Sequence, residues 1–109
     1  MLFSKLGLGQ KITRALEENH YTEPSPIQVQ AIPIIAAGHD VIACAQTGTG
    51  KTAAFSLPLI ERIANSGNTW RQTTVLILSP TRELASQIVE NIKKYSKYLP
   101  IRCEAVYGG

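Results

Sequence analysis

The sequence predicts an α/β fold, a three-layer α/β/α arrangement around a parallel sheet that is truncated to about three strands. Short apolar runs alternate along the chain with longer segments of helical periodicity. The order strand, helix, strand, helix, strand gives two right-handed crossover units, which place helices on both faces of a parallel sheet. A glycine-rich loop also stands between the first apolar run and the helix that follows it, where ligands collect in such sheets.

Two helices are expected before the first strand. Residues 10–19 place apolar side chains on one face at helical spacing and charged side chains on the other. The second helix has Ser25 as its cap, Pro26 at the first helical position and Gln28 three residues after the cap. This helix is expected to kink at its internal proline and to end at Gly38.

The rest of the chain alternates between strands and helices. Strands are expected at residues 40–45, 74–79 and 101–106, and the second of them is nearly all apolar, as in a sheet covered on both faces. Helices are expected at residues 52–64 and 82–99 between them. Loops at the carboxyl ends of the first two strands should therefore form the functional edge of the sheet.

The composition is that of a single soluble globular domain. Of its 109 residues, 44% are hydrophobic and 17% are charged, which excludes a disordered chain. The net charge of +3 favours anionic partners only mildly. Apolar runs are too short to span a membrane, and no signal peptide is indicated, so a cytoplasmic protein is expected. Cys44 and Cys103 fall in strand-like runs, where reduced core thiols are expected rather than a disulfide.

A phosphate-binding loop is the strongest motif. It consists of Ala45, Gln46, Thr47, Gly48, Thr49, Gly50, Lys51 and Thr52. Gly48 and Gly50 let backbone N–H groups approach phosphate oxygens, and the helix start adds its free N–H groups. Lys51 supplies a positive charge for the outer phosphates, and the Thr52 hydroxyl is a ligand for Mg²⁺ bound with the nucleotide. The strict pattern has glycine where this chain has Ala45, a minor departure at the end of a strand.

Three further segments give the motif a context. They are Tyr-Thr-Glu-Pro-Ser-Pro-Ile-Gln at residues 21–28, Pro-Thr-Arg-Glu-Leu-Ala at residues 80–85, and the double glycine Gly108-Gly109. Together with the phosphate loop, and with Phe3 upstream, they resemble the DEAD-box family of ATP-dependent RNA helicases. The resemblance spans residues 3–109 and implies the N-terminal portion of the family's first RecA-like domain, most similar to its bacterial branch.

The resemblance implies an adenine site. Gln28 would read the edge of the adenine, Tyr21 would stack on its face, and Phe3 would act as a lid on the adenine pocket. The side-chain amide suits this task because it offers a donor and an acceptor together. The same glutamine also completes a capping box with Ser25, which any helix start could use, and the two roles can coexist. His20 replaces the glycine that usually heads this motif.

The resemblance also implies contacts with the RNA backbone. The residues concerned are Pro80, Thr81, Arg82, Gly108 and Gly109. Thr81 has an alternative role as a helix cap. Arg82 is not explained by the formation of the helix, and it is therefore the better candidate for a phosphate contact. Lys93, Lys94 and Lys97 form a basic strip that is interpreted as a solvated face, and Trp70 is interpreted as a packing residue.

The sequence lacks part of what hydrolysis requires. ATP hydrolysis needs carboxylates to hold Mg²⁺ and to position water, yet the only aspartate is Asp40, at the wrong end of the first strand. The family takes these groups from an Asp-Glu-Ala-Asp motif, which this sequence does not contain. We therefore expect a chain that binds ATP and Mg²⁺ but does not hydrolyse ATP alone, and that needs a second RecA-like domain. We also expect it to self-associate through exposed sheet edges. The alternatives are a small phosphotransferase and a non-enzymatic nucleotide- or RNA-binding module.

Overall fold

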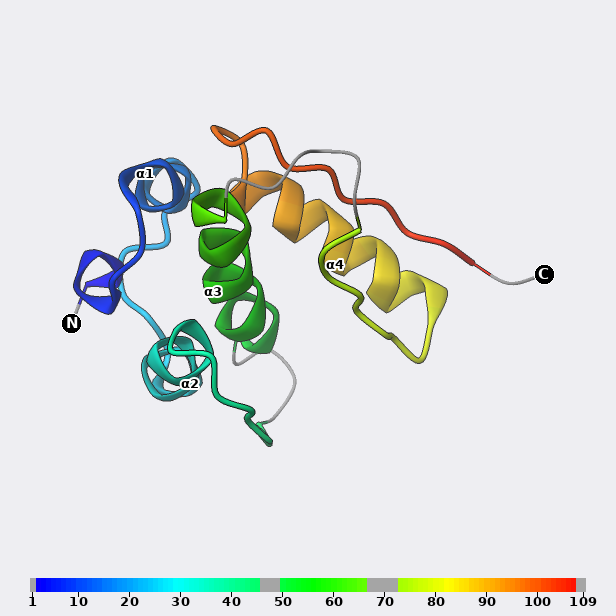
Figure 1. The fold of residues 1–109 in the computed structure, drawn as a ribbon, viewed down its shortest axis with the longest axis horizontal. Coiled ribbons are helices and arrows are strands. Elements are labelled where there is room, and N and C mark those ends of the chain that lie inside the picture. Colours follow the sequence, from blue (N-terminus) through cyan, green and yellow to red (C-terminus); the bar gives the residue numbers. More distant parts are fainter. Residues whose placement is uncertain (1, 46–49, 67–72, 108–109) are drawn as a thin grey trace.

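The computed structural model describes residues 2–45, 50–66 and 73–107. Its elements are a 3₁₀ helix η1 (Phe3–Leu6) and the α-helices α1 (Gln10–Glu18), α2 (Pro26–Ala36), α3 (Lys51–Asn65) and α4 (Arg82–Tyr95). Figure 1 shows α3 at the centre, with α1 and α2 on one side and α4 on the other. Helix α3 packs against both α2 and α4, and α1 also packs against α4. The core lies among these helices and contains side chains from all of them.

The two N-terminal helices agree with the prediction. Helix α1 buries Ile12, Ala15 and Leu16, the predicted apolar stripe. Helix α2 begins at Pro26 as expected, continues through its internal proline, and ends just before Gly38, whose φ of 89° stops it. These boundaries were predictable because periodicity and capping are local signals.

Helix α3 begins one residue earlier and ends one residue later than predicted. It runs through Pro58, which is fully buried in the core. Helix α4 is shorter than predicted, because it ends at Tyr95 instead of continuing to Leu99. The hydroxyl of Ser96 donates to the carbonyl of Ile92 at 2.7 Å, and a turn closed by a bond from Leu99 N–H to Ser96 O at 2.9 Å follows.

The predicted three-stranded sheet is not present in the described residues. Segments 40–45, 73–79 and 101–107 are extended, but none of them is assigned as a strand. In Figure 1 the latter two run along α4, while the first lies below α2 and α3, away from both of them. Ile77, Ile101 and Cys103 of the latter two segments pack against the core. The most exposed apolar side chains on the three segments are Ile42 (96%), Val106 (93%), Leu78 (85%) and Leu76 (79%).

The missing ladder also explains the position of the cysteines. Both thiols are free, but Cys44 is exposed, so its prediction as a core thiol is wrong. Cys103 is half-buried and packs against the core, where burial raises the pKa of its thiol. No helix in the described part of the chain is long and apolar enough to cross a membrane.

Candidate nucleotide and RNA site

The side chain of Gln28 joins the start of α2 to the start of α3. Gln28 is buried, with 7% of its surface exposed. Its Oε1 accepts a hydrogen bond from the N–H of Ser25 at 2.8 Å, which confirms its role at the helix start. Its Nε2 donates to the carbonyl of Gly50 at 3.1 Å. One amide therefore links two segments that are 22 residues apart in the sequence.

Gly50 is the residue at which the phosphate loop enters α3. It has φ +85°, a left-handed conformation that favours glycine, and a Cβ there would lie 2.2 Å from Nε2 of Gln28. The Gly50 carbonyl also accepts from the N–H of Ala54 at 3.1 Å, in the first turn of the helix. The backbone conformation and the position of the Gln28 amide thus both favour glycine at this position.

Lys51 and Thr52 form the first turn of α3. Lys51 is exposed and Thr52 is half-buried. The free N–H groups of this first turn, the lysine charge and the threonine hydroxyl suit an anionic phosphate. Ala45 is described and half-buried, while Gln46, Thr47, Gly48 and Thr49 lie outside the described residues, so their contacts stay a prediction.

A magnesium ion bound with a nucleotide would find one described ligand at the start of α3. Within the described ranges, no group of three or more histidine, cysteine, aspartate or glutamate side chains could hold a metal ion. The Thr52 hydroxyl offers one oxygen ligand at the helix start. Since Mg²⁺ requires octahedral oxygen coordination, phosphates and water would have to supply the others.

The two aromatic candidates for the adenine site have different environments. Tyr21 follows His20, whose φ of 64° turns the chain out of α1. The Tyr21 side chain is 40% exposed, and its ring meets the Tyr95 ring edge-on, with centroids 6.1 Å apart and an interplanar angle of 67°. Phe3 is 4% exposed and belongs to the core cluster with Leu6. Packing accounts for Phe3 in this structure, and its role as a lid stays a prediction.

The start of α4 carries the candidate RNA residues. Thr81 caps the helix, because its Oγ1 accepts from the N–H of Leu84 at 3.1 Å, as the helix-cap interpretation predicted. Pro80 and Arg82 are exposed beside it. Both α3 and α4 begin on the lower side of Figure 1, so the phosphate-loop helix and this segment present their N-terminal ends to a similar side of the molecule.

Tyr107 is a member of this site that the sequence analysis did not identify. The Arg82 guanidinium carbon lies 5.5 Å from the centroid of its ring, and its hydroxyl hydrogen-bonds with that of Ser86. The only feature of the sequence that could have indicated Tyr107 is its position directly before the double glycine. Gly108 and Gly109 lie outside the described residues, but Tyr107 brings the chain that leads into them beside α4.

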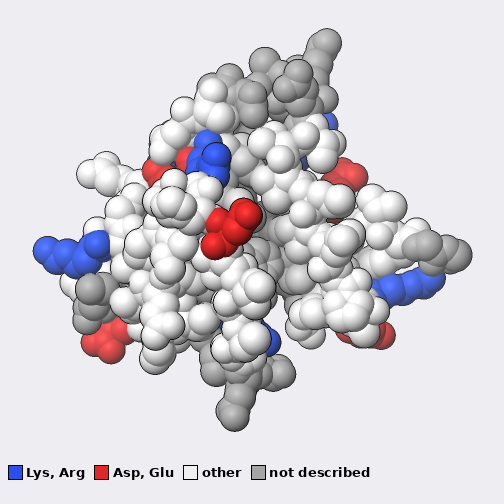
Figure 2. All heavy atoms as spheres, turned by 60° about the horizontal axis from the view of Figure 1, so that its bottom comes forward, with Lys and Arg blue, Asp and Glu red and all other residues white. Residues whose placement is uncertain are grey.

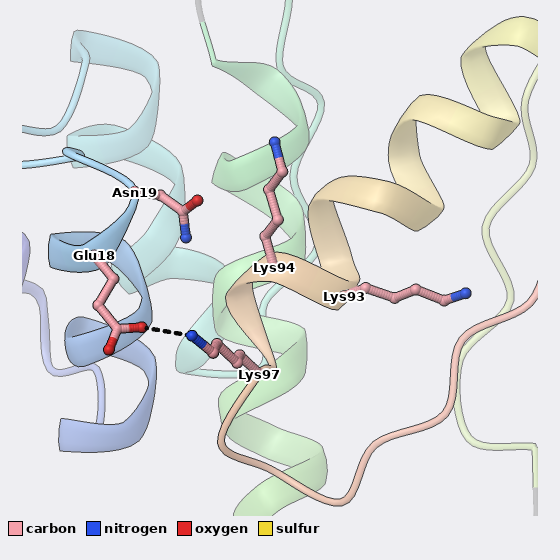
Figure 3. Close-up of a pocket in the computed structure, with 5 residues that line it drawn as sticks. All are labelled: Glu18, Asn19, Lys93, Lys94 and Lys97. Atoms are coloured by element: carbon pink, nitrogen blue, oxygen red, sulfur yellow. Dashed lines mark hydrogen bonds and ion pairs between the residues drawn. The ribbon is translucent and has the colours of Figure 1, made fainter.

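The basic strip lies at the opposite end of α4. Lys93, Lys94 and Lys97 line a shallow surface hollow with Glu18 and Asn19 (Figure 3). Lys93 and Lys94 point in different directions, while Lys97 turns to Glu18 and pairs with it at 3.1 Å. These side chains do not converge on one ligand position, in agreement with a solvated face.

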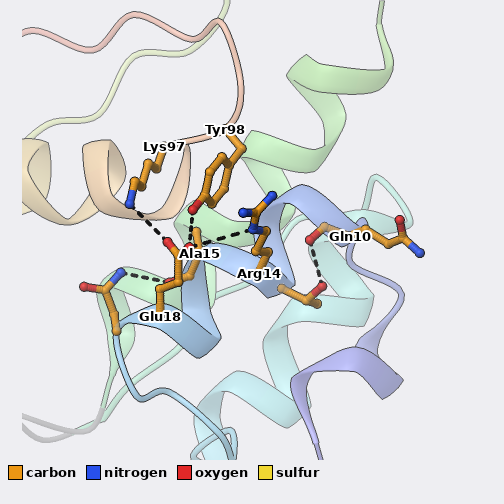
Figure 4. Close-up of polar contacts among 8 residues, drawn as sticks. Gln10, Arg14, Ala15, Glu18, Lys97 and Tyr98 are labelled. Atoms are coloured by element: carbon orange, nitrogen blue, oxygen red, sulfur yellow. Dashed lines mark hydrogen bonds and ion pairs between the residues drawn. The ribbon is translucent and has the colours of Figure 1, made fainter.

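Glu18 is the centre of a polar cluster that fixes α1 to the end of α4 (Figure 4). Its carboxylate accepts from the Tyr98 hydroxyl and from Lys97, and it pairs with Arg14 at 3.7 Å. The Arg14 guanidinium also lies over the Tyr98 ring, 4.4 Å from its centroid. The Tyr98 bond, followed by Lys97, holds the pKa of Glu18 below its usual range, and Glu18 raises the pKa of Lys97.

The charge pattern of the lower face does not define a basic patch. Figure 2 shows that face with its charged side chains scattered among a larger uncharged surface. Recognition of an anion by exposed groups such as Lys51 and Arg82 would have to rest on their placement, and not on a strong overall field.

These features define a class of protein. A glycine-entered helix that begins with lysine and threonine, after a glycine-rich loop, is typical of P-loop nucleotide-binding domains. The family model for DEAD/DEAH box helicases matches residues 25–109. The chain belongs to that family.

Curated relatives and solved structures give the same result. The chain is 47% identical to the DEAD-box ATP-dependent RNA helicase RhpA of Helicobacter pylori over 98% of its length, and 46% identical to the ATP-dependent RNA helicase CshA of Limosilactobacillus reuteri over 100%. It spans 21% of each of these relatives. The RNA helicase Prp28 from Chaetomium thermophilum, solved with ADP, superposes with a TM-score of 0.87 at 37% identity, over 99% of this chain and 27% of that one. A DEAD box protein from Methanococcus jannaschii superposes with a TM-score of 0.78 at 38% identity, over 87% of this chain and 25% of that one.

Proposed function

We propose that this chain is the ATP-binding part of an ATP-dependent RNA helicase. The observation that carries the proposal is the bond from Gln28 to Gly50, because it places the candidate adenine reader at the entrance of the phosphate-loop helix. Lys51 and Thr52 follow directly. Membership of the DEAD/DEAH box family supports the same function.

Gln28 can read adenine without leaving its present position. A primary amide has two N–H donors and an oxygen with two lone pairs. Ser25 uses one lone pair of Oε1, and Gly50 uses one N–H of Nε2. One donor and one acceptor therefore remain, which is the pair that the edge of adenine requires. Tyr21 and Phe3 are the aromatic residues proposed to cover the base.

The triphosphate would lie at the start of α3, with residues 45–52 as its proposed binding loop. Lys51 would contact the outer phosphates, and Thr52 would supply a hydroxyl ligand to Mg²⁺. When bound, the ion neutralises phosphate charge and orients the outer phosphate.

RNA would bind at the start of α4, through its backbone. Arg82 is exposed and suits bidentate contact with a phosphate. Pro80, Thr81, Gly108 and Gly109 would add contacts from their backbone groups to the RNA. Such contacts carry little sequence information, so weak sequence selectivity is expected.

Turnover and unwinding would require more than this chain contains. The sequence holds no pair of carboxylates at the end of an apolar run, and it spans about a fifth of its bacterial relatives. We propose that it is the N-terminal portion of the first of two RecA-like domains in a cytoplasmic protein. Its extended segments would become strands of a three-layer α/β/α fold once partner strands cover them, and alone the chain would self-associate through the exposed Leu76 and Leu78.

The test is RNA-stimulated ATP hydrolysis by a full-length protein that contains this chain. Lys51→Ala should abolish hydrolysis, and Arg82→Ala should weaken RNA binding while ATP binding is retained. Lys93→Ala is the matched control, since it removes an equal charge from the far end of the same helix. If Arg82→Ala binds RNA as the unmodified protein does, the proposed RNA site is wrong.

A further inference from the structure

A second polar link joins α3 to the N-terminal segment. The N–H of Gly9 donates to Oε2 of Glu61 at 2.9 Å, across 52 residues of sequence. The other carboxylate oxygen accepts from the side-chain amide of Asn65 at 2.9 Å, one turn further along α3. Glu61 is half-buried, and its bond to Gly9 is partly buried while its bond to Asn65 is exposed.

The fit around Gly9 shows that this contact is close. Gly9 has an ordinary φ of −68°, so its backbone does not require glycine. A Cβ at this residue would, however, lie 3.1 and 3.3 Å from the two oxygens of Glu61. Gly9 is also the N-cap of α1, and its carbonyl accepts from the N–H of Thr13 at 3.0 Å. The corner between η1 and α1 is thereby held directly on α3.

This corner directly follows the Phe3–Leu6 segment, which carries the residue proposed to cover the adenine base. Helix η1 contributes Phe3 and Leu6 to the core and packs against α2, whose first turn carries Gln28. The phosphate residues are on α3, where Glu61 lies ten residues after Lys51, about 15 Å along the helix. Glu61 therefore connects the helix that holds the phosphate to the segment that carries Phe3.

We propose that Glu61 is a positioning residue for adenine recognition, which holds the Phe3–Leu6 segment in register with the phosphate-loop helix through Gly9. This inference rests on the proposed function. Without the bond between Glu61 and Gly9, a smaller fraction of molecules would have Phe3 in position for the base. The apparent Kd for ATP would rise in inverse proportion to that fraction. Binding of a bare triphosphate, which needs only the start of α3, would not change.

The experiment is calorimetric titration of a full-length protein that contains this chain with ATP and with inorganic tripolyphosphate, both in the presence of Mg²⁺. Glu61→Ala should raise the Kd for ATP about three- to tenfold and leave the Kd for tripolyphosphate unchanged. Glu61→Gln retains an acceptor oxygen and should restore most of the ATP affinity. Asn65→Ala is the matched control and should have little effect, because the bond to Gly9 survives.

Hydrogen exchange of the Gly9 amide gives an independent readout, and it should accelerate in Glu61→Ala. If that variant is unfolded, Gly9→Ala tests the same contact by displacing the carboxylate, and it should weaken ATP binding selectively. Two results would overturn this inference and leave the proposed function intact. One is an equal loss of affinity for ATP and for tripolyphosphate, and the other is faster exchange of the Gly9 amide with unchanged affinity for ATP. Unmodified chain that binds ATP no more tightly than tripolyphosphate would overturn the adenine site itself, and the inference with it.

Discussion

Replacement of Gly50 by alanine should destabilise the protein through two separable effects. The left-handed conformation at φ +85° costs an alanine about 1–2 kcal/mol. The new Cβ would also lie 2.2 Å from Nε2 of Gln28, so the buried amide has to move and lose its bond to the Gly50 carbonyl, at a further cost of about 1–2 kcal/mol. The expected total is a loss of about 2–4 kcal/mol in the free energy of unfolding.

The assay is urea unfolding followed by far-UV circular dichroism. Gly7→Ala is the matched control, since Gly7 has φ +81° but nothing within 4 Å of the added Cβ. It should lose about 1–2 kcal/mol, the conformational part alone. In a Gln28→Ala background the cost of Gly50→Ala should fall to the same level. If Gly50→Ala costs no more than Gly7→Ala in the unmodified chain, the contact between Gln28 and Gly50 does not contribute as the structure indicates.

Three other outcomes follow from single residues. His20→Gly should stabilise the protein by about 0.5–1 kcal/mol, measured by the same unfolding assay, because His20 has φ 64°; a loss of stability would contradict this conformation. A thiol reagent at neutral pH should modify exposed Cys44 faster than Cys103, whose pKa is raised by burial, as followed by mass spectrometry of the two peptides; equal rates would refute the difference in environment. The pKa of Glu18 is lowered and that of Lys97 is raised, so the pair should stabilise the folded protein between their ordinary pKa values of 4.5 and 10.5. This stabilisation should be lost as the pH falls below 4.5 through the lowered pKa of Glu18, or as it rises through the raised pKa of Lys97. Glu18→Gln should therefore be less stable than the unmodified chain inside that window and equal to it in acid, and a gap that persists in acid would be evidence against the cluster.

The helices could be predicted from the sequence because their signals are local. The stripe of Ile12, Ala15 and Leu16 and the cap before Pro26 each lie within a few residues of the helix that they define. The predicted sheet is not confirmed in the described residues, because a strand exists only when a second backbone lies beside it. An apolar run such as residues 74–79 shows that a segment can be a strand, but not whether its partner is available.

In the candidate site, too, local contacts could be predicted from the sequence and contacts between distant segments could not. The capping role of Gln28 follows from its spacing to Ser25, whereas its bond to Gly50 depends on how α2 packs against α3. Tyr107 and Glu61 carried no motif, and they were found only through contacts with residues far away in the sequence. Motifs therefore identified the chemistry of this site, and tertiary packing identified the residues that arrange it.

The most direct test is a comparison of ATP and GTP binding by a full-length protein that contains the unmodified chain and by its Gln28→Ala variant, titrated in the presence of Mg²⁺. Because the free donor and acceptor of Gln28 match adenine and not guanine, the unmodified chain should bind ATP more tightly than GTP. Gln28→Ala should lose that preference, mainly through weaker binding of ATP. Equal affinities for ATP and GTP in the unmodified chain, or a preference that survives in Gln28→Ala, would contradict the claim that this residue reads the base.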